Sequence, residues 1–495
     1  MNLNLLLIIP LVTILIILLL QESKHIRLAA FVGSSLQLIV SLRLLFAYAS
    51  ERAAGNSAQM LFEFNQIWYP SLNIHYHVGV DGISIAMILL TSLVVLTGIL
   101  FSWNMHTQVK EFFFLIVFLS EGAYGFFISL DLFTLFFFLE LAVIPKYLLI
   151  AIWGSGKKIY SANKLALMLM GGSALVLIGI LGMFYHGGET FDILKISQNH
   201  ISLEMQKILF PLVFAGFGVF TAMFPFHTWA PDGHSSAPTA ASMFLAGISM
   251  KLGGYGCLRV AMYLMPEAAQ YYSTWIILLA TIAIIYGAFA TMMQKDLKYI
   301  NAYSSVSHCG FVLLGIGMLT RTALTGAVLQ MVSHGLMTAL FFAAIGMIYE
   351  RSHTRQVSEL GGLLKTIPFI SCVIFIAGLC SLGLPGLSGF VAEMTIFVGS
   401  WQNPDTYHRV ATLLGCASIV VTAVYILRAL GTSVMGPILN EHYLHLKDAA
   451  WNEKLASAIL IISILAIGLA PFWLNNLITP DTQLILSKFS GITGN

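Results

Sequence analysis

The sequence contains little charge: Asp, Glu, Lys and Arg make up only 9% of its 495 residues, against about a quarter in soluble domains. None of its five cysteines (Cys257, Cys309, Cys372, Cys380 and Cys416) forms a CxxC pair, which argues against metal ligation or disulfides and favours buried thiols that simply pack. It also has no P-loop, no GxGxxG after a strand pattern and no basic tract. These absences argue against redox chemistry, nucleotide binding and nucleic-acid binding by this chain.

Long apolar runs take the place of the missing charge. Hydrophobic residues make up 58% of the chain, and the runs, most of them roughly 18 to 25 residues long, match the thickness of a bilayer core. The first run has no basic segment before it and no cleavage site after it, so we expect a retained helix. Short links predict a single all-α membrane domain over 1–495 with about fourteen transmembrane helices. The predicted helices are 3–20, 28–48, 84–103, 112–129, 131–153, 163–185, 208–226, 240–263, 274–293, 299–319, 325–349, 368–398, 409–431 and 455–474.

The distribution of Lys and Arg predicts the orientation. Loops after odd-numbered helices carry fourteen of these residues, and loops and helix ends on the other face carry eight. Because cytoplasmic loops hold the excess of Lys and Arg, the sequence predicts cytoplasmic odd-numbered loops and two termini on the outer, periplasmic side.

Two predicted helices contain helix breakers at corresponding places. The seventh contains FPFHTWAPDGH (224–234) and the twelfth contains GLPGLSG (383–389). Non-helical backbone at membrane depth survives only beside protein or a wet cavity, and such a pair of breaks is typical of transporter repeats. We therefore expect two inverted five-helix repeats, about 112–263 and 274–431, with helices 7 and 12 broken. Two unrelated proline kinks are the alternative.

Seven ionisable residues lie well inside the apolar runs: Glu121, Glu140, Lys146, Lys251, His308, His334 and Glu393. A charge near the bilayer centre costs about 2.5 to 3.5 kcal/mol on insertion scales, so such groups pair, face water or lose their charge. A buried lysine can accept and release a proton, which an arginine effectively cannot, and histidine suits a relay because it titrates near neutral pH. The seven together indicate a polar axis along the midplane; the alternative for each is a structural role. Asp81, Asp131, Asp232 and Asp296 are interpreted as helix-boundary or loop residues.

Several stretches resemble the NuoM family, the antiporter-like M-type subunits of bacterial respiratory complex I, which are related to Mrp-type antiporter subunits. They are GVDGIS (79–84), WAPDGHSSAPTAAS (229–242), LAGISMKLGGYG (245–256), DLKYINAYSSVSHCGF (296–311), QMVSHGL (330–336), YERSHTR (349–355) and LGLPGLSGFVAE (382–393). YERSHTR (349–355), with LGGL (360–363), favours the M type. The chain also ends soon after the fourteenth predicted helix, without the long lateral helix expected of the L type.

The resemblance implies roles for particular residues. Glu140 looks like the family's helix-5 glutamate, and Lys251 like the central helix-8 lysine that passes protons between half-channels. His308 and His334 look like members of the connecting hydrated chain, and Glu393 like the terminal acid in broken helix 12.

One position departs from the family pattern. The family's helix-7 lysine is expected at about Phe220, but the seventh predicted helix has no lysine, and Lys146 stands instead in the fifth, directly after Pro145. Our hypothesis is that the paired cation has moved, so that Glu140 and Lys146 form the switchable ion pair. Six residues give a rise of about 9 Å in a straight helix, which is poor for direct contact, so a proline kink or a bridging water is required. The alternative is that Lys146 snorkels to the cytoplasmic face.

The resemblance thus implies a proton-translocating subunit of NADH:quinone oxidoreductase, passing protons through Glu, Lys and His side chains while quinone is reduced elsewhere in the assembly. It implies no cofactor or metal in this chain; FMN, iron–sulfur clusters and quinone belong to partner subunits. The expected partners are L-type and N-type antiporter-like neighbours, and the expected location is the bacterial inner membrane. The alternatives are a cation/proton antiporter subunit, a membrane hydrogenase subunit, or a structural spacer.

Overall fold

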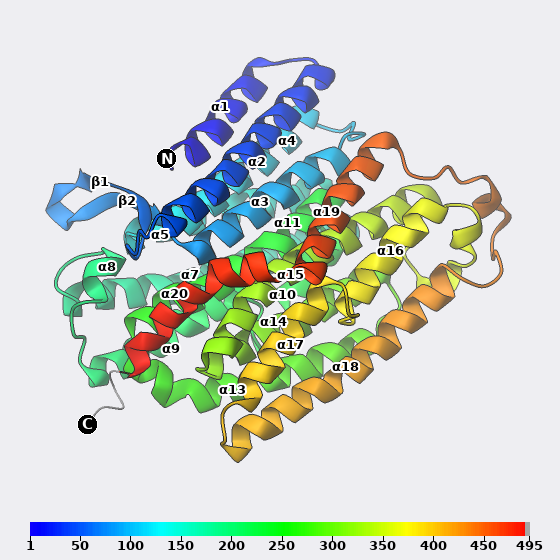
Figure 1. Ribbon diagram of the computed structural model, residues 1–495. Helices are drawn as coiled ribbons and strands as arrows, with labels where there is room; N and C mark the ends of the chain where they lie inside the picture. The colour runs from blue at the N-terminus through cyan, green and yellow to red at the C-terminus, as the bar shows by residue number, and fades with distance from the viewer. Residues whose placement is uncertain (491–495) are drawn as a thin grey trace.

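The computed structural model describes residues 1–490 as a bundle of packed helices with one β-hairpin at its edge (Figure 1). All fourteen predicted segments fold as helices. In the first half these are α1 (Leu5–Leu19), α2 (Ser23–Ala53), α3 (Gly82–Phe101), α4 (Val109–Ile128), α5 (Leu132–Leu141), α6 (Val143–Trp153), α7 (Lys158–His186), α8 (Ile193–Ile196), α9 (Leu203–Phe220) and α10 (Trp229–Ser236). The second half contains α11 (Thr239–Phe244), α12 (Met250–Gly256), α13 (Pro266–Met292), α14 (Leu297–Gly317), α15 (Arg321–Ser352), α16 (Pro368–Ser381), α17 (Ser388–Trp401), α18 (Thr406–Ser433), α19 (Trp451–Leu469) and α20 (Phe472–Ser490).

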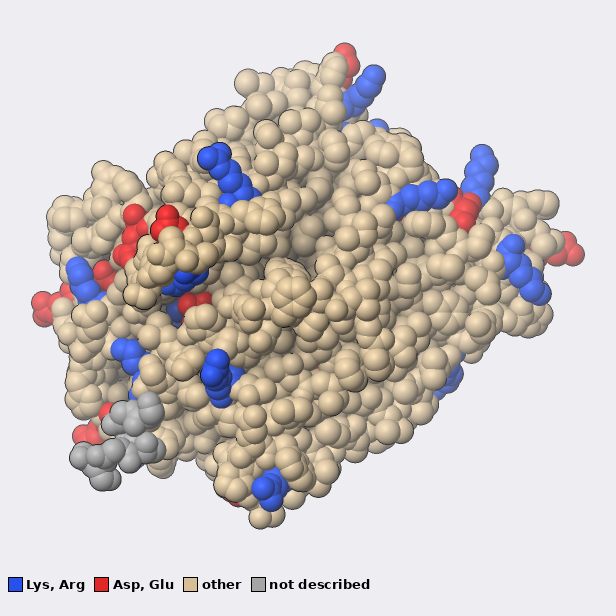
Figure 2. All heavy atoms as spheres, viewed as in Figure 1, with Lys and Arg blue, Asp and Glu red and all other residues tan. Residues whose placement is uncertain are grey.

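Ten helical spans among the described residues, with α5 and α6 counted as one, are long and apolar enough to cross a membrane. The other four predicted segments do not meet these criteria of length and apolar composition, each for an identifiable reason. α1 is short, α14 carries three serines, an asparagine and a histidine, and the eighth and twelfth segments are interrupted. The protein is therefore a mostly helical membrane protein, while the fourteen crossings and the inverted repeats stay predictions. Figure 2 shows charged side chains gathered at two ends of the bundle, with a mostly uncharged surface between them.

Both predicted helix breaks are confirmed. The seventh segment stops at Phe220, passes through a non-helical stretch with a cis Phe224–Pro225 bond, and resumes at Trp229. The twelfth stops at Ser381 and resumes at Ser388, and Gly383 lies between them with a φ of 75°. The eighth segment also departs from a regular helix, since π-helical turns occupy Leu245–Ser249 and Cys257–Met262 on either side of α12. π-bulges occur frequently at functional sites.

Three sequence expectations need correction. A helix follows the fourteenth segment that the sequence did not predict: α20 has 19 residues and packs on α3 and α15. α9 starts five residues earlier than the predicted helix and includes Lys207, whose amine lies 4.1 Å from the Tyr271 ring centroid. Cys372 is exposed rather than buried, whereas Cys257, Cys309 and Cys380 are buried as expected.

The acidic residues interpreted as structural divide into two groups. Asp81, Asp131 and Asp296 accept backbone hydrogen bonds at the starts of α3, α5 and α14, which confirms them as helix caps. Asp232 lies in α10 and accepts from the Lys164 amine at 2.7 Å.

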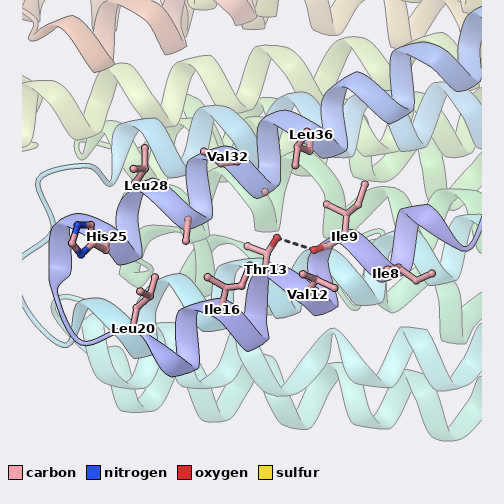
Figure 3. Close-up of a pocket in the computed structure, with 12 residues that line it drawn as sticks. Ile8, Ile9, Val12, Thr13, Ile16, Leu20, His25, Leu28, Val32 and Leu36 are labelled. Atoms are coloured by element: carbon pink, nitrogen blue, oxygen red, sulfur yellow. Dashed lines mark hydrogen bonds between the residues drawn. The ribbon is translucent and has the colours of Figure 1, made fainter.

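An apolar groove of about 460 Å³ separates α1 from α2 on the outside of the bundle (Figure 3). The hydroxyl of Thr13 donates a hydrogen bond to the carbonyl of Ile9. Aliphatic side chains such as Val12 and Val32 line the groove. No ionisable residue expected from the sequence to carry protons lines it, so the groove is not part of the candidate site.

The β-hairpin consists of β1 (Leu61–Tyr69) and β2 (Ile74–Val80). His77 of β2 contacts Glu63 in β1 and also Asp192 at the start of α8. The ring nitrogens of His77 lie 3.2 Å from Glu63 and 3.3 Å from Asp192. Burial opposes protonation of His77, but hydrogen bonds and charge from Asp192 and Glu63 outweigh it and raise its pKa above the ordinary 6.5. Since the folded state binds this proton more tightly, the stabilisation is complete below pH 6.5 and is lost as the pH rises through the raised folded pKa.

We therefore expect the protection of hairpin amides to fall with rising pH, by about tenfold for each pKa unit of the shift. Hydrogen–deuterium exchange, corrected for intrinsic rates, measures it. His77→Gln removes the dependence, and the control His200→Gln, at an exposed histidine, retains it. An unchanged pH dependence in His77→Gln would contradict the assignment.

Candidate functional site

Four of the six predicted site residues meet in the middle of the bundle. Lys251 comes from α12, His308 from α14, His334 from α15 and Glu393 from α17. All four are buried, with exposures of 1%, 3%, 1% and 4% respectively. Segments far apart in the sequence therefore place their ionisable side chains in one enclosed place rather than on separate faces or in contact with lipid.

These four side chains, which we call the central relay, form an unbroken series of contacts. The Lys251 amine lies 2.6 Å from Nδ1 of His334 and donates to the carbonyl of Ala246 at 2.5 Å. The rings of His334 and His308 have centroids 5.3 Å apart. Nδ1 of His308 then lies 3.5 Å from Oε1 of Glu393. The first link is within hydrogen-bond reach, and at the other two a proton can cross after a small side-chain movement or through a bridging water.

Glycines explain why Lys251 and His334 approach so closely. A Cβ on Gly335 would lie 2.8 Å from the carbonyl oxygen of Gly247, and a Cβ on Gly247 would lie 3.3 Å from that of Gly335. The eighth segment and α15 therefore cross backbone to backbone, the arrangement that small residues permit in membrane bundles. His334 precedes this crossing by one residue, so its ring is carried directly to the Lys251 amine.

The break in the twelfth segment shapes the other end of the relay. A Cβ on Gly383 would lie 2.7 Å from Oε2 of Glu393. The non-helical backbone at the break therefore packs closely against this carboxylate. Ser388, the first residue of α17, accepts a hydrogen bond from Ser333 at 2.8 Å. His308 itself is held by Ser381 at 3.1 Å and by Gln330 at 3.2 Å. Polar side chains on both sides of the break therefore orient the last members of the relay.

Lys146 and Glu140 are not in direct contact, although the two groups interact electrostatically. Among the described residues, no carboxylate lies within 4 Å of the Lys146 amine, and one oxygen of Glu140 has no hydrogen-bond partner. The helix is interrupted between the two residues, since Glu140 lies near the end of α5 and Lys146 near the start of α6.

The location of Lys146 is nevertheless informative. The residue is 1% exposed, which contradicts snorkelling to the cytoplasmic face. Its amine lies 5.8 Å from the centroid of the Phe220 ring, within reach of a cation–π contact. The resemblance leads us to expect a lysine at position 220. The amine of Lys146 therefore lies close to the place where the side chain of that lysine is expected.

Sequence reasoning missed two residues between the relay and the face that carries the odd-numbered loops. His234 in α10 is fully buried, and neither ring nitrogen has a hydrogen-bond partner among the described residues. It interacts electrostatically with both Lys251 and Lys298. Lys298, which we had counted as a loop residue, is buried and donates to the carbonyl of Ala237 at 2.7 Å. The signal for His234 was its place inside the helix-breaking stretch, where side chains border non-helical backbone.

A polar cavity of about 580 Å³ opens beside these residues. Its lining includes polar and charged side chains, and Arg355 donates to the carbonyl of Ser235. The lining residues are Ser155, Gly156, Lys157, Tyr160, Ser161, Asp232, Ser235, Ser236, Tyr299 and Arg355.

The chain is similar to known proteins along its whole length. Residues 129–422 match the family described as NADH:quinone oxidoreductase/Mrp antiporter, TM. NADH-quinone oxidoreductase subunit M of Rickettsia conorii is 35% identical over 490 residues, covering 97% of both chains. The chloroplastic NAD(P)H-quinone oxidoreductase chain 4 of Angiopteris evecta is 36% identical and covers 88% of both.

Solved structures share the fold. A chain of respiratory complex I from Thermus thermophilus with bound NADH superposes with a TM-score of 0.89 at 24% identity, covering 99% of this chain and 100% of that chain. A chain of the Mrp complex from Dietzia sp. gives a TM-score of 0.86 at 18% identity, covering 99% of this chain and 98% of that chain. These comparisons, with the buried relay and the two broken helices, show that the chain belongs to the NuoM family of antiporter-like membrane subunits.

Proposed function

We propose that protons cross this chain through the central relay, in the order Lys251, His334, His308 and Glu393. Membership of the NuoM family makes the chain a proton-translocating, antiporter-like subunit of complex I; the path and the role of each residue are our proposal. The observation that carries it is the unbroken series of buried contacts from the Lys251 amine to the Glu393 carboxylate.

Uptake begins at the polar cavity beside α10. Asp232 and Tyr299 line it, and Lys298 and His234 lie between it and Lys251. A proton taken up there passes to the free ring nitrogens of His234 and then to Lys251, because histidine can accept a proton on one nitrogen and release one from the other. We assign this uptake side to the cytoplasm, since the loops around the cavity carry the excess of Lys and Arg.

Glu140 and Lys146 regulate the occupancy of Lys251. When they approach each other, their charges cancel and Lys251 feels less negative potential, so it releases its proton more readily. When they separate, the carboxylate again favours the charged lysine. At an effective dielectric constant of about 20, such charge movements are worth at most a few kcal/mol, which is enough to change proton occupancy severalfold or more. Quinone reduction in the assembled complex drives the change.

The assembly supplies the redox chemistry. We propose that L-type and N-type antiporter-like subunits flank this chain and that subunits elsewhere hold FMN, iron–sulfur clusters and quinone. The chain lies in a bacterial inner membrane with periplasmic termini. An Mrp-type antiporter complex is the competing assembly, because such a chain shares the fold. Co-purification with NADH dehydrogenase subunits supports complex I, and co-purification with other antiporter subunits supports the alternative.

A break in the relay tests the path. His334→Leu removes both ring nitrogens while keeping an apolar side chain in the buried position. We therefore expect about a twofold or greater loss of proton pumping, since a positioned proton-transfer group is removed from the path. Pumping is measured in proteoliposomes by the quenching of a pH-sensitive dye after NADH addition. His445→Leu, in an exposed loop helix, is the control. Wild-type pumping by His334→Leu would refute the relay.

A further inference from the structure

A second buried cluster of charge lies on the β-hairpin side of the relay. Asp81 pairs with the guanidinium of Arg259, and all three of Asp81, Arg259 and Asp481 are less than 5% exposed. Asp481 comes from α20, and its carboxylate accepts the backbone N–H of Gly82 at 2.6 Å. Three segments that are remote in the sequence therefore meet at this cluster. The end of the eighth segment supplies the guanidinium, and the start of α3 and the middle of α20 each supply a carboxylate.

The charges of this cluster do not balance when both carboxylates are ionised. Arg259 pairs with Asp81, and its Nε has no partner among the described residues. Arg52 is the other nearby cation, but it donates to the Tyr48 hydroxyl and to the carbonyls of Asn56 and Ala58 rather than to either carboxylate. An unbalanced buried charge costs several kcal/mol, on the order of the desolvation penalty of one ion. A proton bound by the Asp481 carboxyl group removes that cost.

The cluster is connected to Lys251 along one face of the eighth segment. Lys251, Tyr255 and Arg259 are four residues apart, so they lie on successive turns of the same face. The Tyr255 hydroxyl lies 2.9 Å from Oγ of Ser84, whose N–H donates to Asp81 at 2.8 Å. One π-helical turn lies just before Lys251 and the other includes Arg259. These turns change the directions in which the Lys251 and Arg259 side chains point.

We propose that Asp81, Arg259 and Asp481 form a second proton-release site, which branches from Lys251 to the β-hairpin face in parallel with the route through His334 to Glu393. This inference rests on the proposed function of Lys251. The flexible stem of Lys251 turns from His334 toward Tyr255 and gives up one proton. The hydroxyls of Tyr255 and Ser84 each accept one proton and pass one on, and a carboxylate of the cluster becomes a carboxylic acid. It then loses that proton to water beside the loop at Arg52, and Arg259 stabilises the carboxylate that is restored.

The competing interpretation is structural: Asp481 merely fastens α20 to the start of α3. Asp481→Asn separates the two roles, because an asparagine oxygen still accepts the Gly82 N–H but cannot exchange a proton. In reconstituted complex I we expect about a twofold loss of dye quenching per NADH oxidised, because Asp481→Asn closes the second release site while the route through His334 to Glu393 stays open. Asp481→Glu retains pumping but shifts its pH profile. The control is Asp405→Asn, an exposed helix-capping aspartate at the start of α18.

The outcomes are distinguishable when Lys251→Met is measured in parallel. If Lys251→Met stops pumping but Asp481→Asn pumps with the wild-type rate and pH profile, the release site is wrong and the relay stands. If Lys251→Met itself pumps normally, the proposed function fails. If Asp481→Asn does not assemble on a native gel, Asp481→Glu decides: a shifted pH profile supports the release site, and an unshifted one overturns it.

Discussion

Replacing Lys251 with methionine is expected to stop proton pumping while the bundle stays assembled. Lys251 is the member of the relay that contacts His334, interacts with His234 on the uptake side and leads to Tyr255 on the other. Removing its amine interrupts every route that meets there. Since positioned proton carriers contribute about 10²–10⁴ to rates, pumping by Lys251→Met falls to about 1% of wild type or less.

Assembly is expected to survive because methionine has a similar length and no charge. Replacing a buried charged group by an apolar one of similar volume is often neutral or stabilising. Lys251→Arg provides the sharper comparison: it keeps the positive charge but effectively cannot release a proton, so it also fails to pump. Lys447→Met, at an exposed lysine in a loop, is the matched control. Pumping by Lys251→Arg at the wild-type rate would show that the charge, rather than proton exchange, is what matters.

The sequence predicted the relay because ionisable residues in apolar runs are costly and therefore seldom accidental. Lys251, His308, His334 and Glu393 stood out on that criterion, and the structure brings all four together. The helix breaks were equally visible, since proline and glycine at membrane depth need protein or water beside them.

What the sequence could not show was contact between distant segments. Asp81 was correctly interpreted as a helix cap, but its pairing with Arg259 and its closeness to Asp481 depend on how three segments cross. α20 was missed because Asn475, Asn476, Pro480 and Asp481 interrupt its apolar pattern. Asp481 is buried inside the protein, but a hydropathy window scores it like any other charged residue and so predicts the end of a transmembrane span.

The position of Lys146 allows a test by exchange of residues. Lys146→Met is expected to reduce pumping by about tenfold or more, because a regulating charge worth a few kcal/mol at the relay is removed. A second change, Phe220→Lys, returns an amine to nearly the same place from α9, since the Lys146 amine lies 5.8 Å from the Phe220 ring. We expect the double variant to recover most of the lost pumping.

Recovery is the decisive result, because a mutation that only disturbs packing would be worsened by a second charged residue in the interior. Lys24→Met, at an exposed lysine near the start of α2, controls for loss of a positive charge anywhere on the protein. If Lys146→Met pumps as wild type, the amine has no regulatory role. If Lys146→Met loses pumping and the added Phe220→Lys does not restore it, Lys146 acts through its own contacts rather than by supplying a cation at this location. The hypothesis that the cation moved from α9 to α6 is then wrong.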